Sequence, residues 1–269
     1  MMFRRPYRPS ARRYEDAKRT GLDSAAAAVP HVLDIVRARS IIDIGCGTAL
    51  WLSVFARNGV NRVVGIDGDY IDRNRLAIDP SSFIPGDLNQ PLDGLKLGRF
   101  DLAMSLEVGE HLLPSRADGL VDDLCALSDV VLYGAAIPGQ EGEHHCNERW
   151  QSFWVTKFAS RGYLAYDVLR PKIWGAPKVA YWYKQNTIFY VKSGSPAHDR
   201  FAQRFAAPSS SMFDVIHPDL FWQRIHKRRG LGRLAKNGAR LLSPLLGRNL
   251  LARPRTLSGD EDLILPPRS

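Results

Sequence analysis

Two short runs of this 269-residue sequence bring together side chains that could carry out chemistry. Residues 107–111 read E-V-G-E-H, so that two carboxylates and an imidazole fall within five positions. The second run contains His144 and His145. A carboxylate is a good ligand for a hard divalent cation, and an imidazole titrates near neutral pH and can move a proton. Together the two runs mark a candidate catalytic site.

A third feature is a turn of the form D-x-G-x-G, made by Asp43, Gly45 and Gly47. The apolar, β-branched run before it is typical of a buried parallel strand, and glycines let the backbone approach a ligand closely. A dinucleotide-binding fingerprint would have a third glycine where this sequence has Leu50. With an acid ahead of the turn, the pattern favours a cationic ligand over a pyrophosphate.

Short apolar runs that alternate with helical segments predict the elements that position these residues. We expect helices near 25–39, 115–127 and 150–160, and strands at 41–44, 63–66, 83–88, 100–106, 130–136, 163–169 and 187–191. Such a βαβ pattern predicts an α/β fold with a mostly parallel sheet. The carboxyl ends of its parallel strands share one edge, where open α/β sheets bind ligands. The candidate residues all follow predicted strands at that edge.

The turn at 43–48 resembles the first motif of the class I S-adenosylmethionine (SAM)-dependent methyltransferases, and later motifs follow at the usual distances. Asp67 ends the second strand, Asp87 follows the third, and residues 105–111 follow the fourth. The resemblance spans about residues 22–192 and implies a Rossmann-like sheet of seven mostly parallel strands with helices on both faces. It implies that SAM is bound by Asp43, Gly45, Cys46, Gly47, Asp67, Gly68, Asp87, Leu88 and Ser105.

The E-x-x-E-H spacing is similar to that of metal-assisted O-methyltransferases, including the quinone-precursor and small-RNA 2′-O types. In those enzymes the ion binds adjacent hydroxyls and lowers the pKa of the one that attacks. The resemblance implies a candidate Mg²⁺ site made by Glu107, Glu110, His111 and His145. The alternative is that Glu110 and His111 only order the loop and SAM.

The loop 139–150 follows the fifth predicted strand and should face the same cleft. His145 is a fourth metal ligand, a general base, or part of a loop that only caps the next helix. We expect it to be catalytic together with Glu110 and His111. Zinc bound by His144, His145 and Cys146 would be cramped and would lack a second cysteine pair.

The acceptor is less well defined by the sequence than the methyl donor. Residues 135–140 and the spacing His145-x-Asn147-Glu148-x-Trp150 are similar to a bacterial methyltransferase subgroup associated with glycan and surface-polysaccharide biosynthesis. The aromatic residues of 174–183 either cover the substrate or form a small satellite core. We expect O-methylation of a sugar, a glycan or a related small molecule. A small-RNA 2′-O-methyltransferase and a non-catalytic SAM-binding subunit remain as rivals.

The net charge of +9 is concentrated at the two ends of the chain. Seven Arg and Lys lie in residues 1–20, and ten lie in 219–255 against Asp219 alone, so the central part is mildly acidic. A nucleic-acid site would be surrounded by basic residues, so this distribution argues against nucleic acid as a partner. We expect a basic arm (1–21), a methyltransferase domain (22–192), a linker (193–218) and a basic, amphipathic, helical C-terminal extension (219–269).

Cellular context can also be predicted from composition. No apolar run approaches the roughly 18 residues of a membrane span, and the basic N-terminus lacks the apolar core of a secretory signal. Three cysteines without C-x-x-C spacing indicate reduced thiols in a cytoplasmic protein. The basic residues of 219–255 either contact an anionic membrane surface or a partner protein, bind nucleic acid, or form a solvated helix packed on their own domain.

Overall fold

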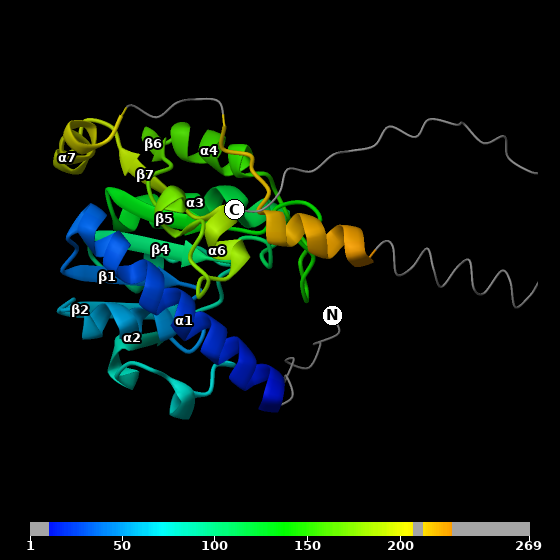
Figure 1. Ribbon diagram of the computed structural model, residues 1–269. Coiled ribbons are helices and arrows are strands. Elements are labelled where there is room, and N and C mark those ends of the chain that lie inside the picture. The colour runs from blue at the N-terminus through cyan, green and yellow to red at the C-terminus, as the bar shows by residue number, and fades with distance from the viewer. Residues whose placement is uncertain (1–10, 207–211, 228–269) are drawn as a thin grey trace, which may run out of the picture. The chain divides into compact units, whose positions relative to one another are not determined.

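The computed structural model describes residues 11–206 and 212–227. Seven strands form one sheet in the order β3-β2-β1-β4-β5-β7-β6, and β7 runs antiparallel to both of its neighbours (Figure 1). The predicted seven-stranded, mostly parallel sheet is therefore confirmed. The strands are β1 (Ser40–Ile44), β2 (Arg62–Asp67), β3 (Phe83–Pro85), β4 (Leu102–Leu106), β5 (Val130–Gly134), β6 (Tyr163–Tyr166) and β7 (Ile188–Lys192).

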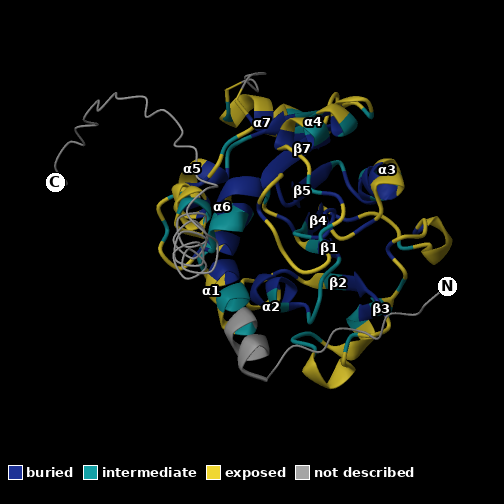
Figure 2. Cartoon of the chain, turned by 90° about the vertical axis from the view of Figure 1, so that its right-hand side faces the viewer, coloured by how far each residue is buried: buried dark blue, intermediate teal, exposed yellow. Residues whose placement is uncertain are grey.

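Helices cover both faces of the sheet (Figure 2). They are α1 (Ala11–Val36), α2 (Leu50–Arg57), α3 (Ala117–Leu127), α4 (Gln151–Ala159), α5 (Arg170–Ile173), α6 (Tyr181–Asn186) and α7 (Pro196–Arg204). Helices α1, α2, α5 and α7 contribute to one hydrophobic cluster, and α3 and α4 contribute to the other.

Successive side chains of a strand point to opposite faces of the sheet, so neighbouring residues join different clusters. On β1, Ile41 packs with α1 and α2, whereas its neighbour Ile42 packs with α3. Both isoleucines are fully buried, and burying a side chain of this size contributes about 1.5–3 kcal/mol. A strand buried on both faces reads as a continuous apolar run, which explains the sequence of β1.

Several element boundaries differ from the sequence-based expectation. Helix α1 begins at Ala11 rather than near residue 25, so it extends into the predicted arm and accommodates Pro30. Strand β3 ends at Pro85, since the chain turns there toward the cavity. The predicted linker contains α7, and its last part packs against α4, where Asp214 accepts hydrogen bonds from the Ser152 N–H and hydroxyl at 2.7 Å each.

The chain divides into two compact units, Met1–Phe221 and Trp222–Ser269. Residues 218–227 are helical, and the rest of the predicted C-terminal extension lies outside the described residues. Across 11–206 and 212–227, every helix falls short of the length and apolar character that crossing a membrane requires.

The contact between β2 and the glycine turn generates a stability prediction. A Cβ on Gly65 would lie 2.6 Å from Cys46 Sγ and 3.1 Å from Leu52 Cδ1, so Gly65→Ala should lower the free energy of unfolding by about 1–3 kcal/mol through overpacking. Gly94→Ala is the control, because a Cβ on Gly94 would have no atom within 4 Å and the φ of Gly94 is not positive. Urea titrations of both variants should separate them, and equal stabilities would contradict the packing described.

Candidate active site

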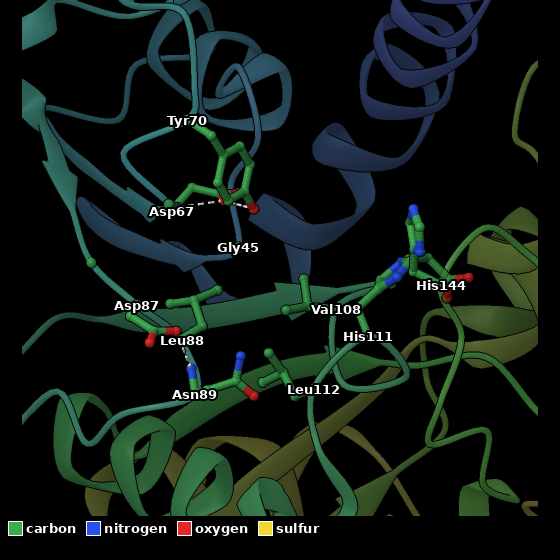
Figure 3. Close-up of a pocket in the computed structure, with 13 residues that line it drawn as sticks. Gly45, Asp67, Tyr70, Asp87, Leu88, Asn89, Val108, His111, Leu112 and His144 are labelled. Atoms are coloured by element: carbon green, nitrogen blue, oxygen red, sulfur yellow. Dashed lines mark hydrogen bonds between the residues drawn. The ribbon is translucent and has the colours of Figure 1, made fainter. Parts of the chain in front are cut away.

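A cavity of ≈ 410 Å³ opens at the carboxyl edge of the parallel strands (Figure 3). This volume is in the range typical of small-molecule and cofactor sites. Its walls come from the residues that follow β1, β2, β3 and β4, with one residue from the loop after β5. The lining residues are Gly45, Asp67, Gly68, Tyr70, Gly86, Asp87, Leu88, Asn89, Glu107, Val108, His111, Leu112 and His144.

The glycine turn contributes Gly45 to the wall of this cavity. Gly45 has a φ of 84°, and a Cβ there would lie 2.3 Å from Val108 Cγ2, so both conformation and space require glycine. The N–H groups of Gly45 and Cys46 donate to the Ile66 carbonyl at 2.8 and 3.1 Å. The turn is therefore fixed to β2 before any ligand binds.

Asp67 organises one end of the cavity. Its Oδ2 accepts from the Gly47 N–H at 2.7 Å, and its Oδ1 accepts from the Gly68 N–H at 2.7 Å and the Tyr70 hydroxyl at 2.8 Å. Figure 3 shows the Tyr70 ring folded back toward Asp67. An acid at this position of a dinucleotide-type fold binds ribose hydroxyls.

The segment after β3 lines the same end. Asp87 Oδ1 accepts from the Asn89 N–H at 3.0 Å, and Leu88 is 9% exposed. Asp87, Leu88 and Asn89 thus offer polar groups beside an apolar surface, which suits a planar heterocycle.

Asp43 lies on β1 just before the turn and is buried, with 4% of its surface exposed. Its Oδ1 has no hydrogen-bond partner, and no Arg or Lys pairs with it in the described part of the chain. Burial, with a smaller contribution from repulsion by Asp67, raises the pKa of Asp43 to about 8. A cationic ligand above the turn would supply the missing stabilisation of the carboxylate.

Glu107 follows β4 in a left-handed conformation, with a φ of 57°. Its Oε2 accepts from Gln140 Nε2 at 2.6 Å, and its Oε1 accepts from Asn186 Nδ2 at 2.7 Å. Desolvation raises the pKa of Glu107 to about 7, although these two hydrogen bonds oppose the shift. Glu107 is therefore held by carboxamides rather than by a group of metal-ligating residues.

Glu110, His111 and His145 form a separate cluster, in which the potential ligand atoms all lie within 4.8 Å of one another. Glu110 is fully buried, and neither carboxylate oxygen has a hydrogen-bond partner of ordinary geometry. Burial and repulsion from Glu107 hold its pKa well above the usual range. Burial, with repulsion from His145 and His144, lowers the pKa of His111 to about 4, so its imidazole is neutral at pH 7.

The loop 139–150 is fastened onto the segment that carries Glu110. The N–H groups of Cys146 and Asn147 donate to the Glu110 carbonyl at 2.8 and 3.0 Å, and Asn147 Nδ2 donates to the Gly109 carbonyl at 3.2 Å. His145 Nδ1 lies 2.8 Å from Glu148 Oε1. Nε2 is therefore the ring nitrogen that is left to contact a ligand.

Glycine at position 142 keeps space beside that nitrogen. A Cβ on Gly142 would lie 2.1 Å from His145 Nε2. The carboxylate of Glu148 orients the His145 ring from behind, as carboxylates commonly do for histidines that bind metal ions.

The structure brings most of the sequence-predicted residues to one edge but gives them different places. Lining the cavity are Gly45, Asp67, Gly68, Asp87, Leu88, Glu107 and His111. Outside the lining are Asp43, Cys46, Gly47, Ser105, Glu110 and His145, of which Ser105 is fully buried on β4. Glu107 does not join the other predicted metal ligands. Sequence reasoning did not single out Tyr70, Gly86, Asn89, Val108 and Leu112 as site residues, although each lies within two positions of a predicted one.

Comparison with known proteins agrees with this geometry. Residues 14–128, a little under half of the chain, match a family described as "Methyltransferase domain". Comparison with curated proteins gives no significant match. Streptomyces venezuelae DesVI has a similar fold, with a TM-score of 0.52, 15% identity, and coverage of 70% of this chain and 100% of DesVI.

Magnesium protoporphyrin IX methyltransferase (ChlM) from Synechocystis PCC 6803, solved with bound SAH, has a TM-score of 0.51 and 16% identity. The match covers 70% of this chain and 90% of ChlM. These two structures share the fold of this chain, and the family match covers its first strands and helices. A weaker likeness, to the methyltransferase domain of bacterial CtHen1, has a TM-score of 0.47 and supports no inference.

The raised pKa of Asp43 predicts how the stability of the unliganded protein depends on pH. A carboxyl whose pKa is higher in the folded state favours folding below its unfolded pKa, and this stabilisation is lost as pH rises from about 4 to about 8. Asp43→Asn should therefore gain stability relative to wild type between pH 5 and pH 8, by on the order of 1–3 kcal/mol. Urea unfolding at both pH values measures this gain.

Asp69→Asn serves as the matched control, because Asp69 is exposed in the neighbouring turn after β2. A parallel pH dependence in wild type and Asp43→Asn would contradict the buried, unpaired carboxyl.

Proposed function

We propose that this chain transfers the methyl group of SAM to a hydroxyl of a sugar, a glycan or a related small molecule. The observation that carries the cofactor assignment is a pair of carboxylates, one in the cavity wall and one on β1 just before Gly45, that have no Arg or Lys partner in the described chain. Asp43 and Glu107 both fit that description, and SAM carries a sulfonium and an ammonium group. Buried charges are normally paired, so the ligand would supply the positive charge.

The positions of the residues suggest how SAM would lie. Asp67 would bind the ribose hydroxyls, and Asp87 and Leu88 would border the adenine. The amino-acid part would pass over Gly45, with its ammonium group directed toward Asp43. The methyl group would then face Glu107 and His111, at the end of the cavity that the loop 139–150 borders.

Methyl transfer from SAM requires little covalent chemistry from the protein. The carbon–sulfur bond breaks with its electron pair left on sulfur, while the acceptor oxygen forms the new carbon–oxygen bond and loses its proton. Holding the two reactants in line and deprotonating the acceptor supply most of the rate enhancement. His145 is our candidate base, because Glu148 fixes its ring and leaves Nε2 for the proton.

A divalent metal ion would fit the cluster of Glu110, His111 and His145. The unpartnered, fully buried carboxylate of Glu110 and the neutral imidazole of His111 are suitable ligands, and Gly142 leaves room at His145 Nε2. Two nitrogens and one carboxylate suit Zn²⁺, Mn²⁺ or Fe²⁺ better than Mg²⁺, which prefers oxygen ligands. When bound, such an ion would lower the pKa of an acceptor hydroxyl.

The glycan class of acceptor rests on the sequence similarity of 135–140 and 145–150. The structure is compatible with a sugar, since Trp150 is 39% exposed at the end of this loop.

Incubating the protein with SAM and separate lipid-linked sugars, nucleotide sugars and RNA would identify the acceptor by methyl uptake. Uptake into RNA alone would replace the proposed acceptor class.

Binding of SAM can be tested directly by calorimetry. Wild type should bind SAM, and Asp43→Ala should abolish detectable binding because the ammonium group loses its buried partner. Asp69→Ala keeps the same net charge as Asp43→Ala and should bind normally. Absence of SAM binding to wild type would overturn the proposed function, and intact binding to Asp43→Ala would overturn the role of Asp43.

The role of His145 can be tested separately from cofactor binding. His145→Ala should retain SAM affinity within about threefold and lose about 100-fold or more in turnover, in keeping with the loss of a general base or metal ligand. Chelator treatment followed by readdition of Mn²⁺, Zn²⁺ or Mg²⁺ distinguishes these two roles. Turnover near that of wild type in His145→Ala would show that the loop is only structural.

A further inference from the structure

Glu107 lies in the cavity wall but does not join the metal-binding cluster. Among the side chains described in 18–206 and 212–227, no Arg or Lys pairs with Glu107, although both of its carboxylate oxygens accept hydrogen bonds. Because this carboxylate borders a ligand cavity and has no cation beside it, we expect the ligand to supply the positive charge.

Carboxamides hold both oxygens of Glu107. Gln140 comes from the loop after β5 and Asn186 from the end of α6, and their amide nitrogens donate at 2.6 and 2.7 Å. Asn186 Nδ2 also donates to Gln140 Oε1 at 3.0 Å, which joins the two donors to each other. These hydrogen bonds favour the ionised form of Glu107 and oppose the rise in its pKa that burial causes. Gln140 and Asn186 together form what is called the amide clamp below.

A second layer fixes the amide clamp from behind. Gln185 Nε2 donates to Gln140 Oε1 at 3.2 Å and to Asn186 Oδ1 at 2.9 Å. The His217 N–H donates to Gln185 Oε1 at 2.9 Å, so the segment around residue 217 closes the network. All four of these residues are at most 5% exposed.

The backbone conformation of Glu107 supports a functional role. A positive φ is uncommon for a residue other than glycine and costs free energy. Here it follows directly after β4, where the Glu107 N–H donates to the Gly134 carbonyl at 2.8 Å. The fold thus holds the carboxylate at the cavity wall against a local preference.

We propose that Glu107 is the counter-ion of the methyl donor's sulfonium group, so that the site distinguishes the cationic donor from its uncharged-sulfur product. This inference rests on the proposed function. Transfer leaves the electron pair of the broken carbon–sulfur bond on sulfur, which becomes a neutral thioether. The attraction to Glu107 then disappears, and product release is favoured.

Asp43 and Glu107 would act on different charges of the same ligand. The ammonium group is present in both SAM and SAH and would lie over the glycine turn, near Asp43. The sulfonium is present in SAM alone and would lie at the end of the cavity where Glu107, Val108 and His111 meet. The two acids therefore offer a matched pair of variants.

The test compares calorimetric affinities for SAM and SAH in Glu107→Gln and Asp43→Asn. We expect Glu107→Gln to weaken SAM binding by about tenfold or more, or about 1.4 kcal/mol, and to change SAH binding by less than about threefold. Asp43→Asn should weaken both ligands by similar factors. Glu107→Asp, which keeps the charge, should recover most of the preference for SAM.

Equal losses of SAM and SAH affinity in Glu107→Gln, or no loss of either, would overturn the proposal while leaving SAM binding by wild type intact.

Should Glu107→Gln fail to fold, as judged by thermal unfolding, Gln140→Met provides the same comparison. It removes one clamp donor and keeps the carboxylate, so the SAM-to-SAH preference should fall by about threefold, in line with one lost charge-assisted hydrogen bond. An unchanged preference in Gln140→Met would contradict the proposal. Failure of wild type to bind SAM at all would instead count against the proposed function.

Discussion

The site depends on an electrostatic constraint: carboxylates are placed at one edge of the sheet with too little positive charge around them. Asp43, Glu107 and Glu110 follow or belong to two adjacent strands, β1 and β4, and none has an Arg or Lys partner in the part of the chain that is described. Desolvation raises the pKa of all three carboxyl groups. Each is stabilised in a different way, and the difference assigns them different roles. Amides hold Glu107, imidazoles lie beside Glu110, and Asp43 is left for a ligand.

This arrangement explains why the loops around the sheet edge are so closely connected. The loop 139–150 supplies Gln140 to Glu107, and its backbone amides at 146 and 147 bind the Glu110 carbonyl. Helix α6 supplies Asn186, and the segment near His217 fixes Gln185 from behind. Aromatic residues between β6 and β7 mostly pack: Tyr183 contacts Trp51 at 4.9 Å, and Trp174 contacts His217 at 4.6 Å between ring centroids. These contacts lie beside the amide clamp, and Tyr183 packs against the main hydrophobic cluster of α1 and α2 rather than in a separate satellite core.

The fold could be predicted from the sequence because its strands are buried on both faces and read as apolar runs. The cavity end around Asp67 was predictable for a similar reason, since Gly45, Asp67 and Asp87 each lie at or just after the end of a strand. Separation of Glu107 from Glu110 could not be predicted, because it depends on a positive φ and on Gln140 and Asn186, which are distant in sequence. The start of α1 was also missed, since its first turns are polar and its Pro30 suggested a later beginning.

The hydrogen bond between Tyr70 and Asp67 has a consequence for how a nucleoside would enter. Tyr70 is 68% exposed, yet its hydroxyl donates to Asp67 Oδ1, so it would compete with a ribose hydroxyl for Asp67 in the proposed complex. Arrival of the sugar would therefore replace one hydroxyl by another, so the net gain from that contact is small. The Tyr70 ring packs on Gly68, where a Cβ would lie 2.0 Å from Tyr70 Cε1, so the exchange would also free this ring to cover the ligand. Affinity at this end would come from covering the ligand with an aromatic ring more than from the acid beneath it.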